Sequence, residues 1–492
     1  MIKKIMGKYT ILPVQVKASF WFLICSFLQK GISVITTPIF TRLLSTAEYG
    51  QFNVFNSWMG ILTIIVTMDL SYGVYARGLV KFEKEREIFS SSLQGLTVVF
   101  CAGWTAVYLI SKDFWNKLFT LSTVQMLSMI LLMWSTAVFT FWASEQRVIY
   151  KYKALVIVTL VTSLAKPIVG IVFVIQSDDK VTARILGLVL VQLLAYTWMF
   201  IVQMARGRKF YVGKYWKHAL IFNIPLIPHY LSQTILNSAD RIMIEKMVND
   251  GCAGIYSLAY ALSSIMIVFN TSLMDTLGPW MYTKIRDRKT KEIAPVAYGS
   301  LIIIGGVNIL LIAFAPEAVA IFAPKSYYEA IWCIPPIAMS VYFMYSYDLF
   351  AKFEFYYEKT KLIAASTMVG AVLNIILNYI CILLFGYIAA AYTTLVCYML
   401  YSIFHYVAMK KVCKSEMNGE YPYETKALLT ITGIFLVIGF SYLATYGNIY
   451  LRYGLTGILV IILVINKNRI KSLLNQMTGL KKNEAKDKEV HS

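Results

Sequence analysis

Apolar stretches of about 20 residues recur from one end of this chain to the other, and short clusters of charged residues separate them. A helix of that length crosses the hydrocarbon core of a bilayer. The composition agrees, because 58% of the residues are hydrophobic, only 15% are charged and the mean hydropathy is +0.62. This balance lies far from that of soluble globular proteins. The pattern therefore predicts an all-α integral membrane protein.

We expect about fourteen transmembrane helices. Their approximate ranges are 18–39, 50–71, 89–110, 122–143, 154–175, 184–204, 217–238, 252–273, 293–315, 327–349, 362–383, 385–406, 427–446 and 449–466. The first apolar segment is too long for the core of a cleaved signal peptide, and no small-residue cleavage pattern follows it. We expect it to remain as the first span.

The distribution of Lys and Arg predicts the orientation. With both termini in the cytoplasm, about 35 of the 46 basic residues fall in cytoplasmic segments and about nine on the opposite side. The net charge of +20 is divided among many short loops, which argues against nucleic-acid binding. The seven cysteines show no CxxC or His-Cys spacing, so we expect no metal site, and nothing indicates a cofactor. The predicted location is the cytoplasmic membrane.

No loop exceeds roughly 25 residues, which leaves no room for a folded domain outside the membrane. A basic connection near residues 207–217 follows the sixth span and divides two groups of six helices. We therefore expect an N-terminal lobe at 1–206 and a C-terminal lobe at 207–410. Two additional helices at 411–470 and a basic cytoplasmic tail at 471–492 complete the organisation.

The two predicted lobes share local patterns. Glu48-Tyr49-Gly50-Gln51-Phe52 and Ala253-Gly254-Ile255-Tyr256 each place Gly-x-aromatic at the start of a span, and a shift of 208 positions sets Lys166 against Asn374. Each lobe has six helices and begins on the inside, so both run the same way through the membrane. We expect a pseudo-twofold axis along the membrane normal and a central cavity between the lobes.

Four motifs fall in order on these spans. They are Pro38-x-x-Thr41-Arg42-Leu43-Leu44 with Tyr49-Gly50; Asp69-Leu70-x-Tyr72-Gly73; Asp240-Arg241 with Gly254-x-Tyr256-Ser257-x-Ala259-Tyr260; and Asn374-x-x-x-Asn378-Tyr379 with Gly386-x-x-Ala389-Ala390. Over residues 15–410 the chain resembles the Wzx-type oligosaccharide flippases of the multidrug/oligosaccharidyl-lipid/polysaccharide (MOP) exporter superfamily. The resemblance implies a two-lobed transporter that passes an undecaprenyl-pyrophosphate-linked oligosaccharide from the inner to the outer leaflet. A polysaccharide polymerase and chain-length machinery are candidate partners.

Five polar residues inside the spans are candidates for substrate binding. Lys30 and Lys166 lie in mid-span, where a lysine costs about 3 kcal/mol, so each either faces a wet cationic cavity or snorkels or pairs with a carboxylate. His229 follows Pro225 and Pro228, which should break the seventh span; it either contacts the headgroup or bonds a carbonyl that the prolines free. Asn374 and Asn378 either bind sugar hydroxyls or tie neighbouring helices together.

Five charged residues near helix ends are candidates for gates or structural pairs. Arg42, Asp240 and Arg241 lie at outer ends, and Asp69 and Asp275 lie near inner ends, where pairing with Arg77, Lys284 or Lys352 is the alternative.

Other functions remain open on the sequence. A multidrug or cation antiporter of the same superfamily should carry carboxylates deep in the N-terminal lobe, whereas the deep charges here are lysines. An integral membrane glycan polymerase should carry longer outer loops with paired carboxylates or arginines. No Walker-type motif appears, which favours transport driven by the membrane potential. We therefore predict a transporter and not an enzyme.

Overall fold

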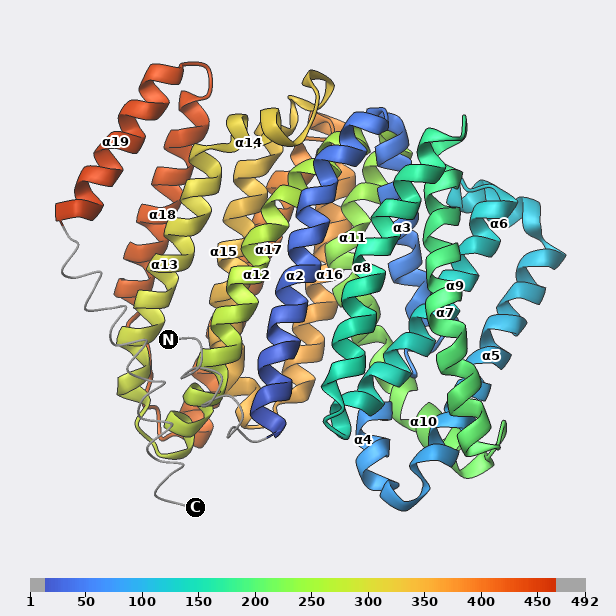
Figure 1. Ribbon diagram of the computed structural model, residues 1–492. Coiled ribbons are helices and arrows are strands. Elements are labelled where there is room, and N and C mark those ends of the chain that lie inside the picture. Colours follow the sequence, from blue (N-terminus) through green and yellow to red (C-terminus); the bar gives the residue numbers. More distant parts are fainter. Residues whose placement is uncertain (1–13, 466–492) are drawn as a thin grey trace, which may run out of the picture. The chain divides into compact units, whose positions relative to one another are not determined.

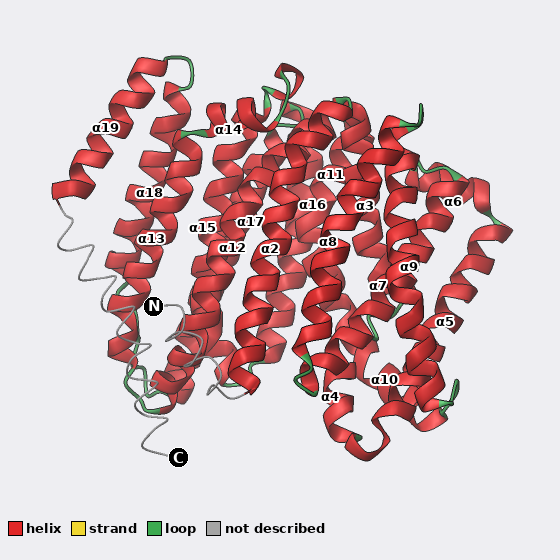
Figure 2. Ribbon diagram, in the orientation of Figure 1, coloured by secondary structure: helices red, strands yellow, loops and turns green. Residues whose placement is uncertain are grey.

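The computed structural model describes residues 14–465 of the 492. Within this range every regular element is a helix, and turns and short loops join them (Figure 2). The prediction of an all-α membrane protein is confirmed. The predicted basic tail at 471–492 lies outside the described residues.

The chain divides after Gly254 into two compact units. In the described part of the first unit, residues 14–254, ten α-helices and two 3-10 helices follow in order along the chain (Figure 1). They are α2 (Val14–Leu43), α3 (Thr46–Val66), α4 (Val74–Lys81), η1 (Glu83–Glu85), α5 (Arg86–Ile110), α6 (Lys112–Phe119), α7 (Thr123–Val148), α8 (Tyr152–Ile175), α9 (Lys180–Gly207), α10 (Gly213–Asn223), η2 (Ile224–Leu226) and α11 (Ile227–Met247). The first turn of α12 (Asp250–Arg286) completes this unit.

The second unit holds the rest of α12 and the helices that follow it. They are η3 (Thr290–Glu292), α13 (Ile293–Ala313), α14 (Ala315–Phe322), η4 (Lys325–Tyr327), α15 (Ala330–Tyr356), α16 (Thr360–Phe385), α17 (Ala389–Glu416), α18 (Thr425–Thr445) and α19 (Ile449–Ile465). The last two helices form a hairpin at the edge of this unit (Figure 1). The unit boundary comes from the contacts between helices, whereas the predicted lobe boundary between 206 and 207 comes from the basic connection that follows the sixth span. The predicted lobes therefore stay a prediction.

Each predicted span coincides with a helical segment. Nine helices of the described range are long and apolar enough to cross a membrane: Glu83–Ile110, Thr123–Val148, Tyr152–Ile175, Lys180–Gly207, Gly213–Met247, Asp250–Arg286, Thr290–Ala313, Leu362–Phe385 and Thr425–Thr445. The multi-pass architecture is thus present, and the count of fourteen stays a prediction.

The helix α15 is an example of a predicted span that is not among the nine strongly apolar helices. It is 27 residues long, and 20 of these are buried among other helices, above all against α17. A helix that faces protein on most sides does not need a uniformly apolar surface, because lipid contacts little of it. Polar and aromatic side chains therefore lower its hydropathy without removing it from the helical bundle.

A tight link joins the first two helices. Only Leu44 and Ser45 separate α2 from α3, and Ser45 caps α3 through a capping box. The backbone N–H of Glu48 donates to the Ser45 hydroxyl at 3.2 Å, and the Ser45 N–H donates to the Glu48 carboxylate at 2.7 Å. The first helix therefore turns back directly into the second.

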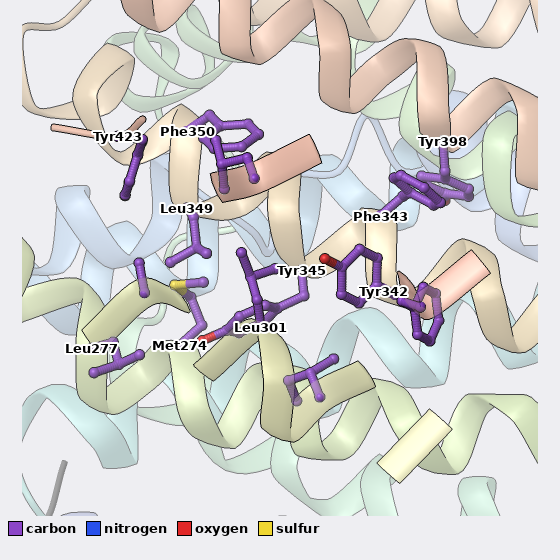
Figure 3. Close-up of a cluster of buried hydrophobic side chains, with 14 of the residues drawn as sticks. Met274, Leu277, Leu301, Tyr342, Phe343, Tyr345, Leu349, Phe350, Tyr398 and Tyr423 are labelled. Atoms are coloured by element: carbon purple, nitrogen blue, oxygen red, sulfur yellow. The ribbon is translucent and has the colours of Figure 1, made fainter. Parts of the chain in front are cut away.

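A large aromatic and aliphatic cluster forms the core of the second unit (Figure 3). Met274 and Leu277 of α12, Leu301 of α13 and Tyr342 of α15 belong to it, and α17 adds Tyr398. The Tyr342 ring stacks on Phe435 of α18 with 4.2 Å between ring centres. This core fixes the positions of the helices that carry the buried polar residues described below.

Candidate functional site

The helix of the seventh predicted span is broken. The helix α10 ends at Asn223, the three residues of η2 form a 3-10 turn, and α11 begins at Ile227. Pro225 and Pro228 lie at this break, and neither has a backbone N–H to continue the helical hydrogen bonds. The interruption expected from the prolines is present, and it places His229 in the first turn of α11.

His229 has an unsatisfied ring nitrogen. Its Nδ1 is buried and has no hydrogen-bond partner in the part of the chain that the structure describes. The ring lies 5.8 Å from that of Tyr230, which in turn meets the Tyr72 ring edge-on at 5.7 Å. A buried polar atom without a partner is costly unless water or a ligand reaches it. His229 therefore stays a candidate for contact with a polar headgroup.

The chain leaves α3 through a strained turn. Met68 and Asp69 have φ angles of 51° and 48°, in the left-handed region that costs a residue with a side chain about 1–2 kcal/mol. Asn223 is fully buried and donates from Nδ2 to the carbonyl oxygens of Met68 at 2.9 Å and Asp69 at 3.0 Å. Asn223, which precedes the break in the seventh predicted span, thus stabilises the turn that ends the second predicted span. Such strain is often stored at functional sites.

These two irregular segments bring Asp69, Tyr72, Arg77 and Tyr230 together, and His229 adjoins them through its ring contact with Tyr230. Asp69 and Arg77 both lie within electrostatic range of the Tyr230 hydroxyl, and the Arg77 guanidinium lies 5.4 Å from the Phe222 ring centre. The five residues, which we call the inner polar cluster, are Asp69, Tyr72, Arg77, His229 and Tyr230. The contacts of α4 with α10 place it at the end of the unit that the basic loops predict to face the cytoplasm (Figure 1).

The two mid-span lysines occupy adjacent helices. Lys30 is exposed on α2, and Lys166 is half-buried on α8, which packs against α2. The Lys166 Nζ lies 5.6 Å from the centre of the Tyr196 ring of α9, a cation–π contact. Among the described residues, no carboxylate lies within ion-pair distance of either lysine. Their pairing with an acidic neighbour, one of the alternatives, is not seen here.

The outer candidates have local partners. Arg42 is exposed and donates to the Pro38 carbonyl at 2.8 Å. Asp240 is buried, with 1% of its surface exposed, while Arg241 donates to the Ser57 hydroxyl of α3 at 3.4 Å. Arg241 thus links α11 to α3. A role as a gate stays a prediction for all three residues.

Arg184 makes two close cation–π contacts that its place in the sequence did not predict. The Arg184 guanidinium of α9 lies 3.6 Å from the ring centres of both Phe40 of α2 and Phe52 of α3. In the sequence, Arg184 stands at the start of a predicted span, and aromatic residues stand at the ends of two other spans. That was the signal available.

In the second unit, Asn374 and Asn378 lie one turn apart on α16 and are fully buried. The Asn378 Nδ2 donates to the Asn374 Oδ1 at 3.2 Å, and the Thr393 hydroxyl of α17 donates to the Asn378 Oδ1. These contacts tie α16 to α17, as the alternative interpretation of the two residues expects. The Asn374 Nδ2 has no partner within the described ranges, so substrate contact stays a prediction.

Asp275 is exposed on α12.

A second feature that the sequence argument missed is a buried His–Glu pair. The His405 Nδ1 of α17 lies 2.7 Å from the Glu354 Oε1 of α15, and its Nε2 lies 3.2 Å from the Ser366 hydroxyl of α16. His405 is 1% exposed and Glu354 is fully buried. The two residues stand 51 positions apart, and nothing in the sequence places a histidine beside Glu354.

Hydroxyl groups also line a small cavity between α12, α15 and α17. Ser263, Ser264, Ser340 and Thr394 contribute to its wall, and the cavity volume is about 10 Å³. This space holds one water molecule and is too small for a sugar ring. The Ser263 hydroxyl has no hydrogen-bond partner among residues 14–465, so a water here would satisfy it.

Comparisons with known proteins identify a matching family and two relatives. The family model described as "Polysaccharide biosynthesis protein" matches residues 16–285. A Haemophilus influenzae protein named for the Lsg locus is 24% identical over 211 residues, 40% of this chain. That match spans 51% of the relative, about half of its length. A second membrane protein of the same organism is 21% identical over 374 residues, which are 73% of this chain and 88% of that protein.

Two solved structures share the fold. The lipid II flippase MurJ in an inward closed conformation gives a TM-score of 0.67 at 14% identity, over 91% of this chain and 99% of that one. An inward-facing multidrug resistance MATE family transporter of the MOP superfamily gives 0.58 at 11% identity, over 79% of this chain and 96% of that one. At these identities the likeness concerns the fold alone.

Proposed function

Because this chain belongs to the polysaccharide biosynthesis protein family, we propose that it flips an undecaprenyl-pyrophosphate-linked oligosaccharide from the inner to the outer leaflet of the bacterial cytoplasmic membrane. The resemblance of its motifs to Wzx-type flippases supports this substrate class. Its fold, shared with MurJ and with MATE transporters of the MOP superfamily, supports movement by alternating access. The product would serve capsule, O-antigen or exopolysaccharide synthesis, and no catalytic step is involved.

The observation that carries the proposal is the pair of lysines inside the first unit. Lys30 and Lys166 lie in the middle of helices that pack side by side, and neither is neutralised by a carboxylate among the described residues. Two positive charges at this depth are costly in lipid, at about 3 kcal/mol each on insertion scales. A diphosphate group that binds between them recovers that cost through charge-assisted hydrogen bonds. An anionic headgroup thus fits these helices better than a cation.

The inner polar cluster is the proposed entry for the headgroup. Arg77 and His229 offer donors to phosphate oxygens, while Tyr72 and Tyr230 offer hydroxyls and ring faces on which sugars stack. The broken helix and the strained turn are the irregular backbone that membrane transporters place at binding sites. At the outer end, Arg42, Asp240 and Arg241 are the proposed gate.

The membrane potential is the proposed driving force. A lipid diphosphate carries about two negative charges, and an inside-negative potential favours the outward movement of each by about 2.3 kcal/mol per 100 mV. Both termini lie in the cytoplasm in this proposal, because the basic loops then face inward. A polysaccharide polymerase with its chain-length machinery would take up the product on the outer side.

The test is reconstitution of the purified protein with a lipid-linked oligosaccharide and measurement of its transfer between leaflets. We expect Lys30→Ala and Lys166→Ala each to lower the rate at least tenfold, because each removes a charge that contacts the diphosphate. The matched control is Lys153→Ala, which removes the same charge at the exposed inner end of α8. Equal rates in all four proteins would remove the cationic binding site from the proposal.

The same vesicles distinguish cation antiport from transfer of the lipid-linked oligosaccharide. An antiporter would move a cationic drug against a proton or sodium gradient and would leave the lipid-linked oligosaccharide in its original leaflet. Drug movement with no lipid transfer in the wild-type protein would replace the proposed function by that alternative.

A further inference from the structure

The buried Glu354–His405 pair is surrounded by groups that fix where its protons lie. The Ser366 hydroxyl has a single proton, and it donates to the Ile363 carbonyl at 2.7 Å, a shorter contact than the 3.2 Å to the His405 Nε2. When that proton goes to the Ile363 carbonyl, the contact to Nε2 forms a hydrogen bond only if Nε2 carries a proton and donates to the Ser366 oxygen. The 2.7 Å contact between Nδ1 and Glu354 also needs a proton.

Two arrangements meet these requirements. Either a charged imidazolium donates from Nδ1 to the Glu354 carboxylate, or a protonated Glu354 donates to Nδ1 of the neutral ring. Both have zero net charge, and both hold one proton more than a carboxylate beside a neutral histidine. Such an uncharged pair is also the form that burial favours, because His405 and Glu354 are both almost fully buried.

Loss of the extra proton would leave a buried negative charge. The Glu354 Oε2 is buried and has no hydrogen-bond partner in the described part of the chain. The titratable and charged groups that face the pair are Tyr347, Asp348 and Lys352 of α15 and Tyr401 of α17, and α16 adds the hydroxyls of Ser366 and Thr367. Lys352 is already paired with Asp348 at 2.8 Å, so it does not neutralise Glu354. An unpaired buried carboxylate is strongly disfavoured.

Water reaches the pair only if α15, α16 and α17 move apart. The rings of Tyr347 and Tyr401 cover His405, with ring centres at 5.5 Å and 4.5 Å. The Tyr401 hydroxyl bonds Thr367 at 3.1 Å and so joins α17 to α16 beside the pair.

We propose that Glu354 and His405 form a proton-binding site of the second unit, whose loading with one proton is tied to the packing of α15, α16 and α17. The packed arrangement binds the proton, and the hydrated arrangement releases it as hydronium to water, which leaves the Glu354 carboxylate and a neutral His405. The use of this proton to drive substrate movement rests on the proposed function, whereas the site itself does not.

The first test needs no substrate. A folded protein that keeps one proton, which an unfolded chain loses above about pH 7, becomes less stable as the pH rises above about 7, by up to tenfold in the unfolding equilibrium per pH unit. In Glu354→Gln the amide donates to Nδ1 as the protonated acid does, and this part of the pH dependence should vanish from thermal unfolding in nanodiscs. Equal slopes for wild type and Glu354→Gln would overturn the site.

The matched control is Glu416→Gln. Glu416 lies at the end of α17 and accepts from Lys359 at 2.7 Å, and this hydrogen bond lowers the pKa of the Glu416 carboxyl. It is a carboxylate on the same helix group but outside the buried pair, so its variant should keep the wild-type slope above about pH 7. If Glu416→Gln also lost the fall of stability with pH, that fall would come from surface groups and the proposal would be overturned.

A second measurement uses the wild-type protein, in case Glu354→Gln does not fold. The chain has four histidines, so nitrogen NMR of selectively labelled histidine resolves individual rings. One ring, identified by its loss in His405→Gln, should keep a proton on Nε2 at pH values where exposed histidines are neutral. A His405 ring with a bare Nε2 and a proton on Nδ1 at about pH 7 would be the unloaded form and would overturn the proposal.

Vesicles then test the link to transport. With a proton gradient and no membrane potential, a coupled protein should move lipid-linked oligosaccharide faster than without the gradient, and Glu354→Gln should show no acceleration. One outcome is lipid transfer at the same rate with and without the gradient, while stability still depends on pH through Glu354. This outcome would contradict the coupling but not the proton-binding site or the flippase function. If no lipid were transferred and stability showed the same pH dependence, the proposed flippase function would be wrong and the proton-binding site would remain.

Discussion

Gly50 and Gly254, which stand 204 positions apart in the chain, pack backbone against backbone at the starts of α3 and α12. A Cβ on Gly50 would lie 2.0 Å from the Asp250 carbonyl oxygen, and a Cβ on Gly254 would lie 2.0 Å from that of Thr46. Thr46 and Asp250 are also 204 positions apart, so the contact is reciprocal. The glycines of the two Gly-x-aromatic repeats thus meet where α3 begins and at the first turn of α12.

We expect Gly50→Ala and Gly254→Ala each to destabilise the protein by about 2–3 kcal/mol, because the helices must separate to admit a methyl group. Thermal unfolding in detergent or nanodiscs measures the effect. The control is Gly103→Ala on α5, where a Cβ meets nothing within 4 Å and where alanine favours the helix by about 0.5–1 kcal/mol. Similar unfolding temperatures for all three variants would contradict the close crossing.

Asn223→Ala should weaken the strained turn after α3. The substitution leaves the carbonyls of Met68 and Asp69 without their shared donor, which costs about 2 kcal/mol for buried acceptors. Proteolysis or hydrogen exchange at residues 67–73 should rise together with the loss of stability. Asn237→Ala is the control, because that exposed side chain donates to the Gln233 carbonyl of its own helix and does not contact the turn through any bond to Met68 or Asp69. Equal protection of the turn in both variants would show that Asn223 does not hold it.

Arg184→Lys should cost about 1 kcal/mol, although it keeps the charge. A planar guanidinium covers the Phe40 and Phe52 rings at once, and an ammonium group does not. The comparison variant is Arg147→Lys, whose guanidinium lies 5.9 Å from the single ring of Phe22. We expect the unfolding temperature to fall in the first variant and to stay within error in the second. The reverse order would rule out stacking as the role of Arg184.

Arg452 attaches the last hairpin to the second unit. Its side chain is 5% exposed and bonds Glu317 of α14, which also accepts from the Tyr453 hydroxyl at 2.9 Å. We expect Arg452→Ala to cost about 2 kcal/mol, because Glu317 keeps its charge and loses its partner. Glu317→Gln in the same chain should recover part of that loss. Lys325→Ala, which removes an exposed cation, is the control.

A double-mutant cycle of Arg452 and Glu317 measures the coupling between them. A coupling energy near zero would mean that the hairpin is held by other contacts, such as the bond from the Tyr446 hydroxyl to the Ile312 carbonyl at 2.6 Å.

Local features of the sequence predicted the helices and their interruptions. Apolar runs gave the helical spans because only a helix satisfies its own backbone in lipid. Pro225 and Pro228 predicted the break before His229, since a missing N–H acts on its own turn. The Gly-x-aromatic repeats indicated related spans, but the reciprocal contact of Gly50 with Gly254 depends on how two helices cross.

By itself, then, the sequence determined an all-helical membrane chain with charged residues at known depths. The tertiary structure decided which of these charges have partners: Arg184 lies between rings from two other helices, and His405 reaches Glu354, 51 positions earlier in the chain. Hydropathy fixes where a residue lies along its helix, whereas the rotation and crossing of packed helices fix what its side chain meets. Those contacts join residues far apart in the chain, so no local pattern records them.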